Sequence, residues 1–358
     1  MKIVNIEAKK LNIKLTKPFS YFTASLKYLP YVLITIKTDM GIIGIGEASL
    51  AWDITGETNK GALDMIKYLE LFVVGKNIDK LKDIEEIMEN INLHIHSNSG
   101  LKCGVEMALL DALGKCKNKP VNQLFSNNKK VEYVIPQQVI SFENHDEELL
   151  KSVVEPALKS KVRNFKFKVG NDLKSVINLL EKVSKYYPKL DIVFDVNQGW
   201  KDFKTAKKII KKIEKYNISW IEQPISCHDY EGFSKLREIT KIPIMADESC
   251  HNLLDLENLH KRKAIDYINI KLAKSGGILE ALRMIKYCDK YKIKYMLGDM
   301  IHSSIGTAVN LHMATLGNFI AFDLTQPDRI KDDPASGIIF DNYKFFIPQK
   351  PGLGVRLK

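Results

Sequence analysis

The sequence predicts an α/β protein in which a closed (β/α)₈-type barrel follows an α+β module. From about residue 131 onward, short apolar runs alternate with lysine-rich stretches of helical spacing, which is typical of a parallel sheet. Eight such runs in about 190 residues favour a closed barrel over an open sheet. The runs are residues 134–140, 164–169, 192–196, 219–222, 243–246, 267–270, 294–297 and 319–324.

The first third of the chain has a different pattern, with strands first and helices after them. Residues 3–11, 31–37 and 42–46 read as strands of a meander, because they cluster β-branched and aromatic residues around an Asp-Met-Gly turn. Amphipathic helices are expected at three places, and the final stretch is expected to return to this α+β module. These segments are residues 60–71, 78–91, 104–116 and 334–358.

The composition is that of an ordinary globular protein, with 45% hydrophobic residues and a net charge of +11 over 358 residues. Only six residues are arginine, the side chain that base and phosphate recognition favours. In the densest lysine run, residues 204–215, apolar residues keep helical spacing, so the lysines read as a solvated helix face. We expect no nucleic-acid partner, and a nucleic-acid-binding protein on a degenerate barrel is a distant alternative.

No stretch approaches the roughly 18 apolar residues of a membrane span, and the N-terminus lacks the apolar core of a signal peptide. The five cysteines are odd in number and include no CxxC pair, which favours free thiols in a reducing compartment. We therefore expect a cytoplasmic protein with no membrane partner. The sequence leaves open whether it forms a homo-oligomer.

A charged residue ends, or nearly ends, almost every apolar run. In a barrel the carboxyl ends of the strands open onto one face, where catalytic residues gather, so these side chains should converge. A single aspartate here would be explained as a helix cap or a solvated loop residue, but lysine is not a cap residue. The positions repeat at one βα unit each, at Lys168, Asp195, Glu222, Asp247, Lys271, Asp299 and Asp323.

Three of these acids, Asp195, Glu222 and Asp247, come from consecutive strands. Three carboxylates brought together without a cation would repel one another strongly. Hard oxygen ligands without a neighbouring Cys or His pattern suit Mg²⁺ better than zinc or copper. The sequence therefore predicts a Mg²⁺ site formed by these three side chains.

The lysines predict proton transfer. Lys166 and Lys168 are two residues apart on one strand, so both point into the barrel mouth, and their repulsion lowers the pKa of a lysine towards that of a usable base. Lys271 lies across the barrel from them. Two lysines on opposite sides of one carbon acid, beside a metal that holds an enediolate, indicate a racemase or epimerase; with one base idle, they indicate a β-elimination or cycloisomerisation.

At these residues the sequence resembles the enolase superfamily, specifically its muconate-lactonizing subgroup. The combination of motifs is highly specific and extends over nearly the whole chain. The matching segments are KFK at 166–168, DVNQGW at 195–200, IEQP at 221–224, MADES at 245–249, NIKLAKSGG at 269–277, SSIG at 303–306, PGLGV at 351–355 and GIIGIGE at 41–47.

The resemblance implies a TIM-like (β/α)₇β barrel, residues 126–325, under an α+β capping domain, residues 1–125 completed by about 326–358. It implies Asp195, Glu222 and Asp247 as Mg²⁺ ligands and Lys168 and Lys271 as the two acid/base residues. Lys166 would lower the pKa of Lys168 and help to hold the substrate carboxylate.

Within the subgroup the chain resembles dipeptide epimerases, which act on a dipeptide by 1,1-proton transfer at the α-carbon of its C-terminal residue. The segment FDLT at 322–325 is similar to their Asp-x-Asp motif, which binds the substrate's α-ammonium group. An N-acyl amino acid racemase, an o-succinylbenzoate synthase and a muconate cycloisomerase share the fold and stay as alternatives, since none of them needs Asp323 to face an ammonium.

Two positions depart from the pattern of these relatives. Thr325 stands where the second Asp of the motif is expected, and Asp299 either supplies the missing charge or is a solvated acid at the rim. His302 stands where many relatives have Glu, and we expect it to be a packed, hydrogen-bonded residue. Ile301 and Gln137 are further candidate contacts of the substrate.

The capping loop bears on specificity. Ala-Glu epimerases have an arginine there, whereas this chain has about Ala24 at that position and offers aromatic surface from Tyr21 and Phe22. An acidic side chain left without a cation is costly to bury. We therefore predict a preference for dipeptides with an apolar or aromatic C-terminal residue over Ala-Glu.

Overall fold

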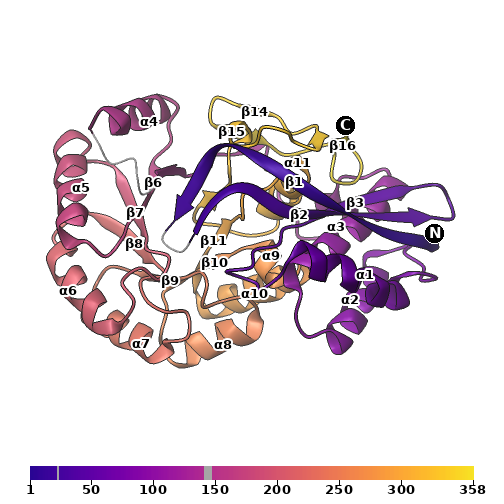
Figure 1. Ribbon diagram of the computed structural model, residues 1–358, viewed down its shortest axis with the longest axis horizontal. Coiled ribbons are helices and arrows are strands. Elements are labelled where there is room, and N and C mark those ends of the chain that lie inside the picture. Colours follow the sequence, from indigo (N-terminus) through magenta and orange to yellow (C-terminus); the bar gives the residue numbers. More distant parts are fainter. Residues whose placement is uncertain (22–23, 141–146) are drawn as a thin grey trace.

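The computed structural model describes residues 1–21, 24–140 and 147–358. Its N-terminal part is an antiparallel sheet in the order β1–β2–β3, with helices packed against it (Figure 1). The elements are β1 (Ile3–Tyr21), β2 (Ala24–Thr38), β3 (Ile43–Ala48), α1 (Asn59–Val73), α2 (Leu81–His94), α3 (Ser99–Cys116) and the 3-10 helix η1 (Val121–Leu124).

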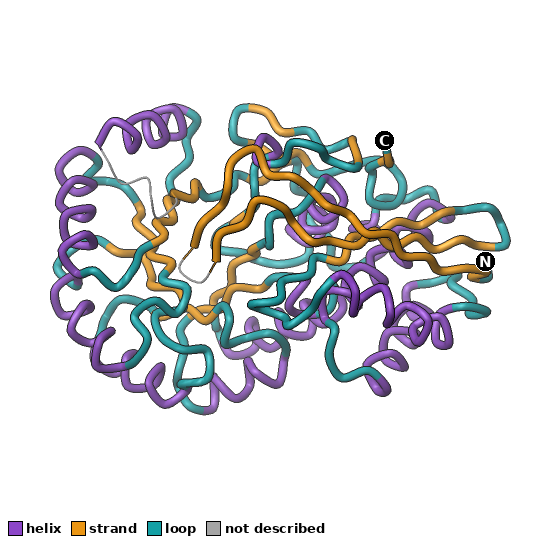
Figure 2. Tube along the Cα trace, in the orientation of Figure 1, coloured by secondary structure: helices purple, strands orange, loops and turns teal. Residues whose placement is uncertain are grey.

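Strands β1 and β2 are much longer than the sequence pattern predicts. They pair from Ile3 opposite Thr38 to Tyr21 opposite Ala24, and the hairpin that they form reaches from the sheet over the barrel (Figure 2). The segment expected to be a capping loop is therefore largely strand. Apolar residues of this hairpin pack on Ile301 and Ile330, which join it to the C-terminal half of the chain.

Helix α3 is the buried centre of the N-terminal part, with every residue from Gly100 to Gly114 buried. It lies so close to β3 that a Cβ atom built on Gly46 would stand 1.9 Å from the carbonyl oxygen of Gly104. Glycine is required at this crossing because any side chain would push helix and sheet apart.

The barrel is confirmed. The described residues include an eight-stranded parallel sheet in the order β12–β11–β10–β9–β8–β7–β6–β5, and the Gln137 N–H donates to the Phe322 carbonyl at 2.7 Å between its two edges. The strands are β5 (Gln138–Ile140), β6 (Asn164–Lys168), β7 (Asp191–Asp195), β8 (Ile218–Glu222), β9 (Ile244–Ala246), β10 (Tyr267–Ile270), β11 (Lys294–Gly298) and β12 (Phe322–Asp323).

Helices alternate with these strands and surround the sheet (Figure 1). In α6 the isoleucines face the core while Lys204, Lys208, Lys211 and Lys212 are exposed, as expected of a solvated face. The helices are α4 (Glu147–Lys159), α5 (Leu173–Tyr186), α6 (Phe203–Ile213), α7 (Tyr230–Ile239), α8 (Leu253–Lys261), α9 (Leu272–Ser275), α10 (Ile278–Tyr291) and α11 (Ser304–Ala314).

One expected barrel strand is divided. Residues 134–140 were predicted as a single strand, but Val134 belongs to β4 (Tyr133–Val134), which pairs with β15 outside the barrel, and only β5 enters the barrel. Pro136 lies between the two and has no N–H to donate to a ladder, so the chain changes sheets there.

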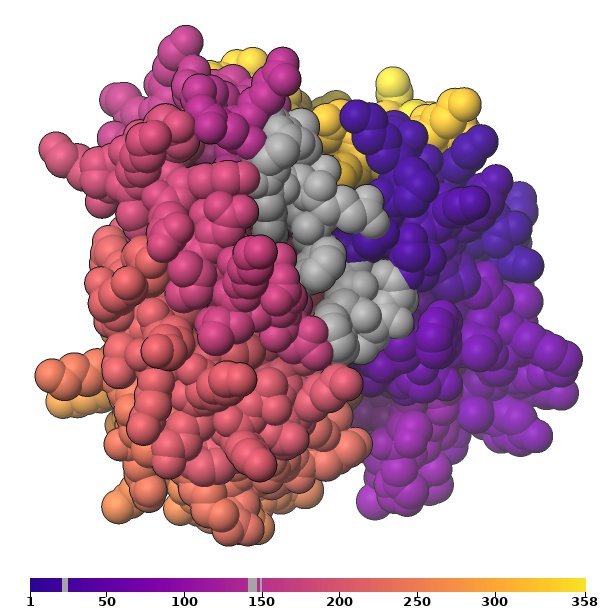
Figure 3. Space-filling model, turned by 60° about the vertical axis from the view of Figure 1, so that its left-hand side comes forward, coloured from indigo at the N-terminus to yellow at the C-terminus, as the bar shows by residue number. Residues whose placement is uncertain are grey.

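The last part of the chain returns to the N-terminal part, as predicted. The Leu353 N–H donates to Asp111 of α3 at 2.8 Å, and the space-filling view shows the C-terminal residues beside the N-terminal ones, across from the barrel (Figure 3). Its elements are the 3-10 helix η2 (Pro327–Arg329), β13 (Ala335–Ser336), β14 (Phe340–Asp341), β15 (Lys344–Phe346) and β16 (Arg356–Leu357).

The domain boundaries at about residues 125 and 326 stay a prediction. Among the described residues, no helix combines the length and the apolar character that crossing a membrane requires.

Candidate active site

The seven charged residues predicted at strand ends come together at one end of the barrel. Each closes or directly follows its strand: Lys168 ends β6, Asp195 ends β7 and Glu222 ends β8. Asp247, Lys271 and Asp299 follow β9, β10 and β11 within one residue, and Asp323 ends β12. Lys168 pairs with Asp195 and Lys271 with Asp247, Glu222 and Asp323 both pair with Lys166, and Asp299 is in none of these ion pairs.

Each of the three predicted metal ligands is paired with a lysine. Asp195 Oδ2 lies 2.6 Å from Lys168 Nζ, and Glu222 Oε2 lies 2.8 Å from Lys166 Nζ. The two oxygens of Asp247 are held by different lysines. Its Oδ2 atom lies 2.8 Å from Lys271 Nζ, and its Oδ1 atom lies 2.6 Å from Lys274 Nζ.

Negative charge is nevertheless crowded here. Burial and the neighbouring Asp195 and Asp247 charges raise the pKa of Glu222 to about 7, although Lys166 opposes the shift. Burial, together with Asp247 and Asp195, raises the pKa of Glu248 to about 8. A divalent cation would stabilise these acids in their ionised forms.

The donor chemistry fits Mg²⁺, because the neighbouring strand ends offer only carboxylate oxygens and Glu248 Oε2 is buried with no hydrogen-bond partner among the described residues. As the side chains stand in the described part of the chain, no three acidic, Cys or His groups converge closely enough to hold an ion. The lysine contacts account for this, since each of the three carboxylates turns at least one oxygen towards an ammonium.

The lysines differ in environment. Lys166 is fully buried among Asp323, Glu222 and Asp195, and these charges outweigh burial and hold its pKa well above the usual value. Asp247 and Glu222 likewise raise the pKa of Lys271 against the effect of burial. For Lys166 and Lys271 the neighbouring carboxylates therefore raise the pKa, whereas repulsion between Lys166 and Lys168 was expected to lower the pKa of a lysine. Lys166 and Lys168 both contact Asp195, so they point the same way, as their spacing predicts.

A cavity of about 520 Å³ opens above this network. Lys168 and Lys271 both line it, whereas Lys166 and the three predicted metal ligands lie beneath its floor. Five of the predicted substrate-binding residues also line it. These are Asp323, Thr325, Asp299, Ile301 and Gln137.

Two family models match the chain. One, described as the mandelate racemase / muconate lactonizing enzyme N-terminal domain, matches residues 4–126, and the other, described as enolase C-terminal domain-like, matches residues 148–358. The chain belongs to the enolase superfamily.

Full-length relatives carry racemase and epimerase names. An N-succinyl-L-Arg/Lys racemase of Bacillus cereus is 29% identical over 100% of this chain and 96% of its own, and its crystal structure superposes with a TM-score of 0.92. An L-Ala-D/L-Glu epimerase of Clostridium acetobutylicum is 31% identical over 99% of both chains. A dipeptide epimerase of Cytophaga hutchinsonii, solved with Mg and the dipeptide D-Ala-L-Val, has a TM-score of 0.91 at 28% identity and covers 100% of this chain and 96% of its own. The chain is an isomerase of this racemase and epimerase family.

Several polar residues at the barrel end of the cavity were not predicted from the sequence. Lys274 is buried and donates to Asp247 and to the carbonyls of Cys250 and Asn269, so it fixes the first residue after β9. Asn197 accepts from Lys168 at 2.9 Å. The signal for Lys274 was its place three residues after Lys271, one helical turn on.

Residues at the rim of the cavity were not predicted either. Trp52 is 59% exposed and lines the cavity. Lys17 of β1 and Arg329 of η2 line the cavity too, so a guanidinium is available in this site after all. Arg329 gave no sequence signal, because it reaches the cavity only through the docking of η2 on β1, where Lys331 N–H donates to the Lys14 carbonyl.

The predicted residues at the hairpin tip are only partly visible. Tyr21 and Ala24 pair at the tip, but the description of the structure does not extend to their side chains, and Phe22 lies outside the described residues. His302 is buried, and its Nδ1 lies 2.8 Å from Ser49 Oγ and 3.0 Å from Glu47 Oε1. It is a packed, hydrogen-bonded residue, as predicted.

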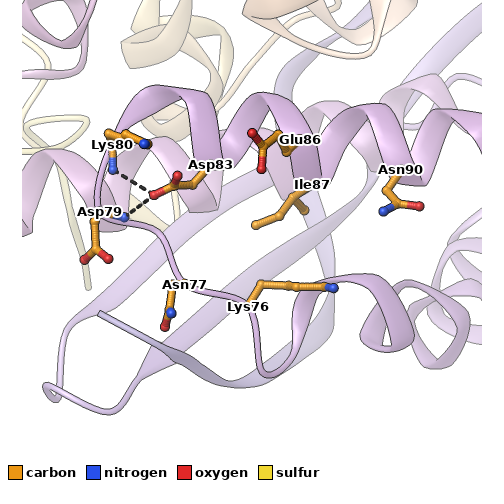
Figure 4. Close-up of a pocket in the computed structure, with 8 residues that line it drawn as sticks. All are labelled: Lys76, Asn77, Asp79, Lys80, Asp83, Glu86, Ile87 and Asn90. Atoms are coloured by element: carbon orange, nitrogen blue, oxygen red, sulfur yellow. Dashed lines mark hydrogen bonds between the residues drawn. The ribbon is translucent and has the colours of Figure 1, made fainter.

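A second hollow, of about 490 Å³, lies against α2 in the N-terminal part (Figure 4). Asp83 points towards the start of α2 and accepts the N–H groups of Asp79 and Lys80 at 2.7 and 3.1 Å, which is a helix-capping role. It shares no lining residue with the cavity over the barrel. This hollow is therefore separate from the predicted acid/base residues Lys168 and Lys271, which line the barrel cavity.

Proposed function

We propose that this protein is a Mg²⁺-dependent dipeptide epimerase that moves a proton at the α-carbon of the C-terminal residue with two lysines. The observation that carries the proposal is the placement of Lys168 and Lys271, which come from β6 and β10 of one barrel and line one cavity. Binders of nucleic acid have no use for two such lysines above a floor of carboxylates.

Asp195, Glu222 and Asp247 would hold the metal. When bound, Mg²⁺ would supply positive charge to the oxygens of the substrate carboxylate and so make the neighbouring α-proton more acidic. The Cytophaga hutchinsonii relative, solved with Mg and a dipeptide, supports this assignment. The lysine contacts of the three carboxylates would loosen as the cation takes their place.

The two lysines exchange one proton across the α-carbon. One lysine in its neutral form takes the proton, and the electron pair of the broken C–H bond passes into the carboxylate to give an enediolate. The other lysine, as an ammonium, returns a proton to the opposite face, and the configuration is inverted. The step needs no oxidant or leaving group, so it balances within the substrate and the two side chains.

A dipeptide is favoured over an N-acyl amino acid because Asp323 lines the cavity, where it can face an ammonium. An N-acyl amino acid racemase, an o-succinylbenzoate synthase and a muconate cycloisomerase stay as alternatives. An Asp323→Asn variant distinguishes them, since it would leave their activity on their own substrates intact.

A preference for apolar or aromatic C-terminal residues is supported by the cavity wall, because Phe19, Leu26 and Leu29 of the hairpin line the cavity that the two lysines also line. Arg329 favours a second candidate, an epimerase of acidic dipeptides, because a guanidinium can pair with a carboxylate. Arg329→Gln would lower kcat/KM for L-Ala-L-Glu selectively if the second candidate is right.

The experiment is a dipeptide panel in deuterium oxide with Mg²⁺, read by NMR for exchange at the α-carbon and for inversion. We expect exchange and epimerisation of dipeptides with apolar C-terminal residues. Exchange with none of the dipeptides and none of the N-acyl amino acids would refute the function, and a clear preference for L-Ala-L-Glu would refute the apolar specificity. Mg²⁺ dependence, a cytoplasmic location and a homo-oligomeric state are checked by chelation, fractionation and light scattering.

A further inference from the structure

The Asp299 carboxylate is held in one position beside the cavity by three donors. Thr325 N–H donates to Oδ2 at 2.7 Å, Thr325 Oγ1 donates to Oδ1 at 3.1 Å, and Ile301 N–H donates to Oδ1 at 3.2 Å. Asp299 is therefore no mobile rim acid. Thr325 stands where the second acid of the Asp-x-Asp motif is expected. It is also the residue whose N–H and hydroxyl hold Asp299.

The backbone around Asp299 is strained to achieve this. Ile301 has φ +64°, and it is the one β-branched residue with positive φ in the described part of the chain. Such a conformation is unfavourable for a β-branched residue and persists only where surrounding contacts impose it. Tyr31 of the hairpin provides such contacts, because its hydroxyl lies within hydrogen-bond distance of the carbonyls of Met300 and Ile301 and shares its one proton between them.

The other acid of the motif is already paired. Asp323 Oδ2 lies 2.6 Å from Lys166 Nζ, and Lys166 is wholly buried. Lys166 also contacts Glu222 and Asp195, so its one positive charge is shared among three carboxylates. Burial and the nearby Asp323 charge raise the pKa of Asp299 although His302 opposes the shift, and the groups that donate to its carboxylate are neutral. Among the described residues no ammonium contacts Asp299, so a cationic group of a ligand can pair with it.

A neighbouring amide indicates that a polar ligand binds at this edge of the cavity. Gln137 is 3% exposed and lines the cavity, yet neither its Nε2 nor its Oε1 has a hydrogen-bond partner among the described residues. Its backbone joins the strand of Asp323 through the bond to the Phe322 carbonyl. A buried amide with no partner costs free energy that a bound polar group would recover.

The geometry points to Asp299 as the second carboxylate of the substrate's α-ammonium site, moved from β12 to the end of β11 and positioned by Thr325. This assignment rests on the proposed dipeptide epimerase function. The ammonium would lie between Asp299 and Asp323, with the Gln137 amide available to the adjacent peptide group. The substrate class is therefore dipeptides with a free amino terminus, and N-acylated compounds would bind poorly.

The test compares the best dipeptide of the panel with its N-acetyl derivative on the same enzyme preparation. Wild type should prefer the free amine. In Asp299→Asn, kcat/KM for the free amine should fall about 10- to 100-fold, while that for the N-acetyl derivative should change by less than about 3-fold. The ratio between substrates does not depend on how much of the variant folds. Lys174→Ala, at an exposed position of α5, serves as control.

A relocation variant tests the positioning directly. Asp299→Ser combined with Thr325→Asp returns the acid to β12, and it should recover the preference for the free amine to within about 10-fold of wild type. If Asp299→Asn leaves the ratio of kcat/KM between the free amine and the N-acetyl derivative unchanged, the assignment is overturned while dipeptide epimerisation stays in place. A wild type that prefers N-acetyl substrates would overturn it as well, whereas no turnover of any dipeptide would refute the proposed function itself.

Discussion

Buried carboxylates occur in two regions of the molecule, the mouth of the barrel and the seam along α3, where this helix meets β3, the C-terminal segment and α10, and their partners differ. At the seam, Glu106 of α3 accepts the N–H groups of Ile278 and Leu279 at the start of α10, at 2.5 and 3.2 Å. Asp111 of the same helix accepts those of Ile45 and Leu353, at 2.9 and 2.8 Å. The partners at the seam are mainly backbone groups.

At the mouth the partners are lysine side chains. Asp195, Glu222 and Asp247 each contact an ammonium that can move away without breaking a helix or a strand. Backbone donors hold a carboxylate in one place and join parts of the fold, whereas side-chain ammonium groups leave it free to change partner. Asp111 also pairs with Lys115, so the comparison teaches that neither burial nor a lysine partner alone separates the proposed metal ligands from structural acids. Two backbone donors on one carboxylate distinguish the acids of the seam from the three proposed metal ligands.

The largest effect is expected at the mouth lysines. Lys168→Ala and Lys271→Ala should each lower the rate of epimerisation by about 10³-fold or more, because inversion needs both an acceptor and a donor of the proton. The rate is measured by polarimetry or chiral chromatography. Lys174→Ala should behave as wild type, and a loss of less than about 10-fold in either mouth variant would contradict the role of that lysine.

Removal of metal should affect the mouth alone. A chelator should abolish epimerisation, and added Mg²⁺ should restore it. Asp195→Asn should weaken Mg²⁺ binding in calorimetry by about 10-fold or more. Even the loss of a group that only orients a ligand lowers metal affinity by about that factor, and Asp195 is a proposed ligand. Glu106→Gln at the seam should leave Mg²⁺ affinity unchanged. Full activity in excess chelator would exclude a metal-dependent reaction.

At the seam the largest effect is expected on stability. Glu106→Ala leaves two buried N–H groups at the start of α10 without acceptors, and it should lower the free energy of unfolding by about 3 kcal/mol. Urea denaturation measures this, with Glu86→Ala on the exposed face of α2 as the matched control. Specific activity of the folded fraction should stay near that of wild type. An unchanged urea midpoint would show that Glu106 does not hold the seam.

A smaller effect is expected in the pH dependence of stability. Burial raises the pKa of Glu106 from about 4.5 to about 8, so between these values the folded state binds more protons than the unfolded state. Stability attributable to Glu106 therefore falls as the pH rises through this window, by about 1 kcal/mol per pH unit at the steepest. Urea midpoints of wild type should fall more steeply with pH than those of Glu106→Gln, and parallel curves would contradict the shift.

The mouth could be predicted from the sequence and the seam could not, for a physical reason. Residues such as Asp195 and Glu222 follow buried strands in a repeating pattern, and the closure of a barrel places strand ends together whatever the details of packing. Glu106 and Asp111 lie inside a buried helix, and their partners become neighbours only when two distant segments dock.

The same reason explains only some of the errors. The length of the hairpin was underestimated although Leu11, Ile13 and Leu15 continue the apolar alternation beyond residue 11; the alternation stops only at Lys17 and Pro18. Arg329 and Trp52 reach the cavity through tertiary contacts alone. The roles of the lysines and of the metal ligands, in contrast, were predicted from strand ends, and the structure places these residues within reach of one another.

The most direct test of the two-lysine account is α-proton exchange in deuterium oxide by the two single variants, each offered both epimers of the best dipeptide. Lys168→Ala should exchange the α-proton of one epimer only, through Lys271, and Lys271→Ala should exchange that of the other epimer only, through Lys168, with neither variant inverting the centre. If both variants exchange the same epimer, or if either still inverts it, the two lysines do not act on opposite faces and the account is wrong.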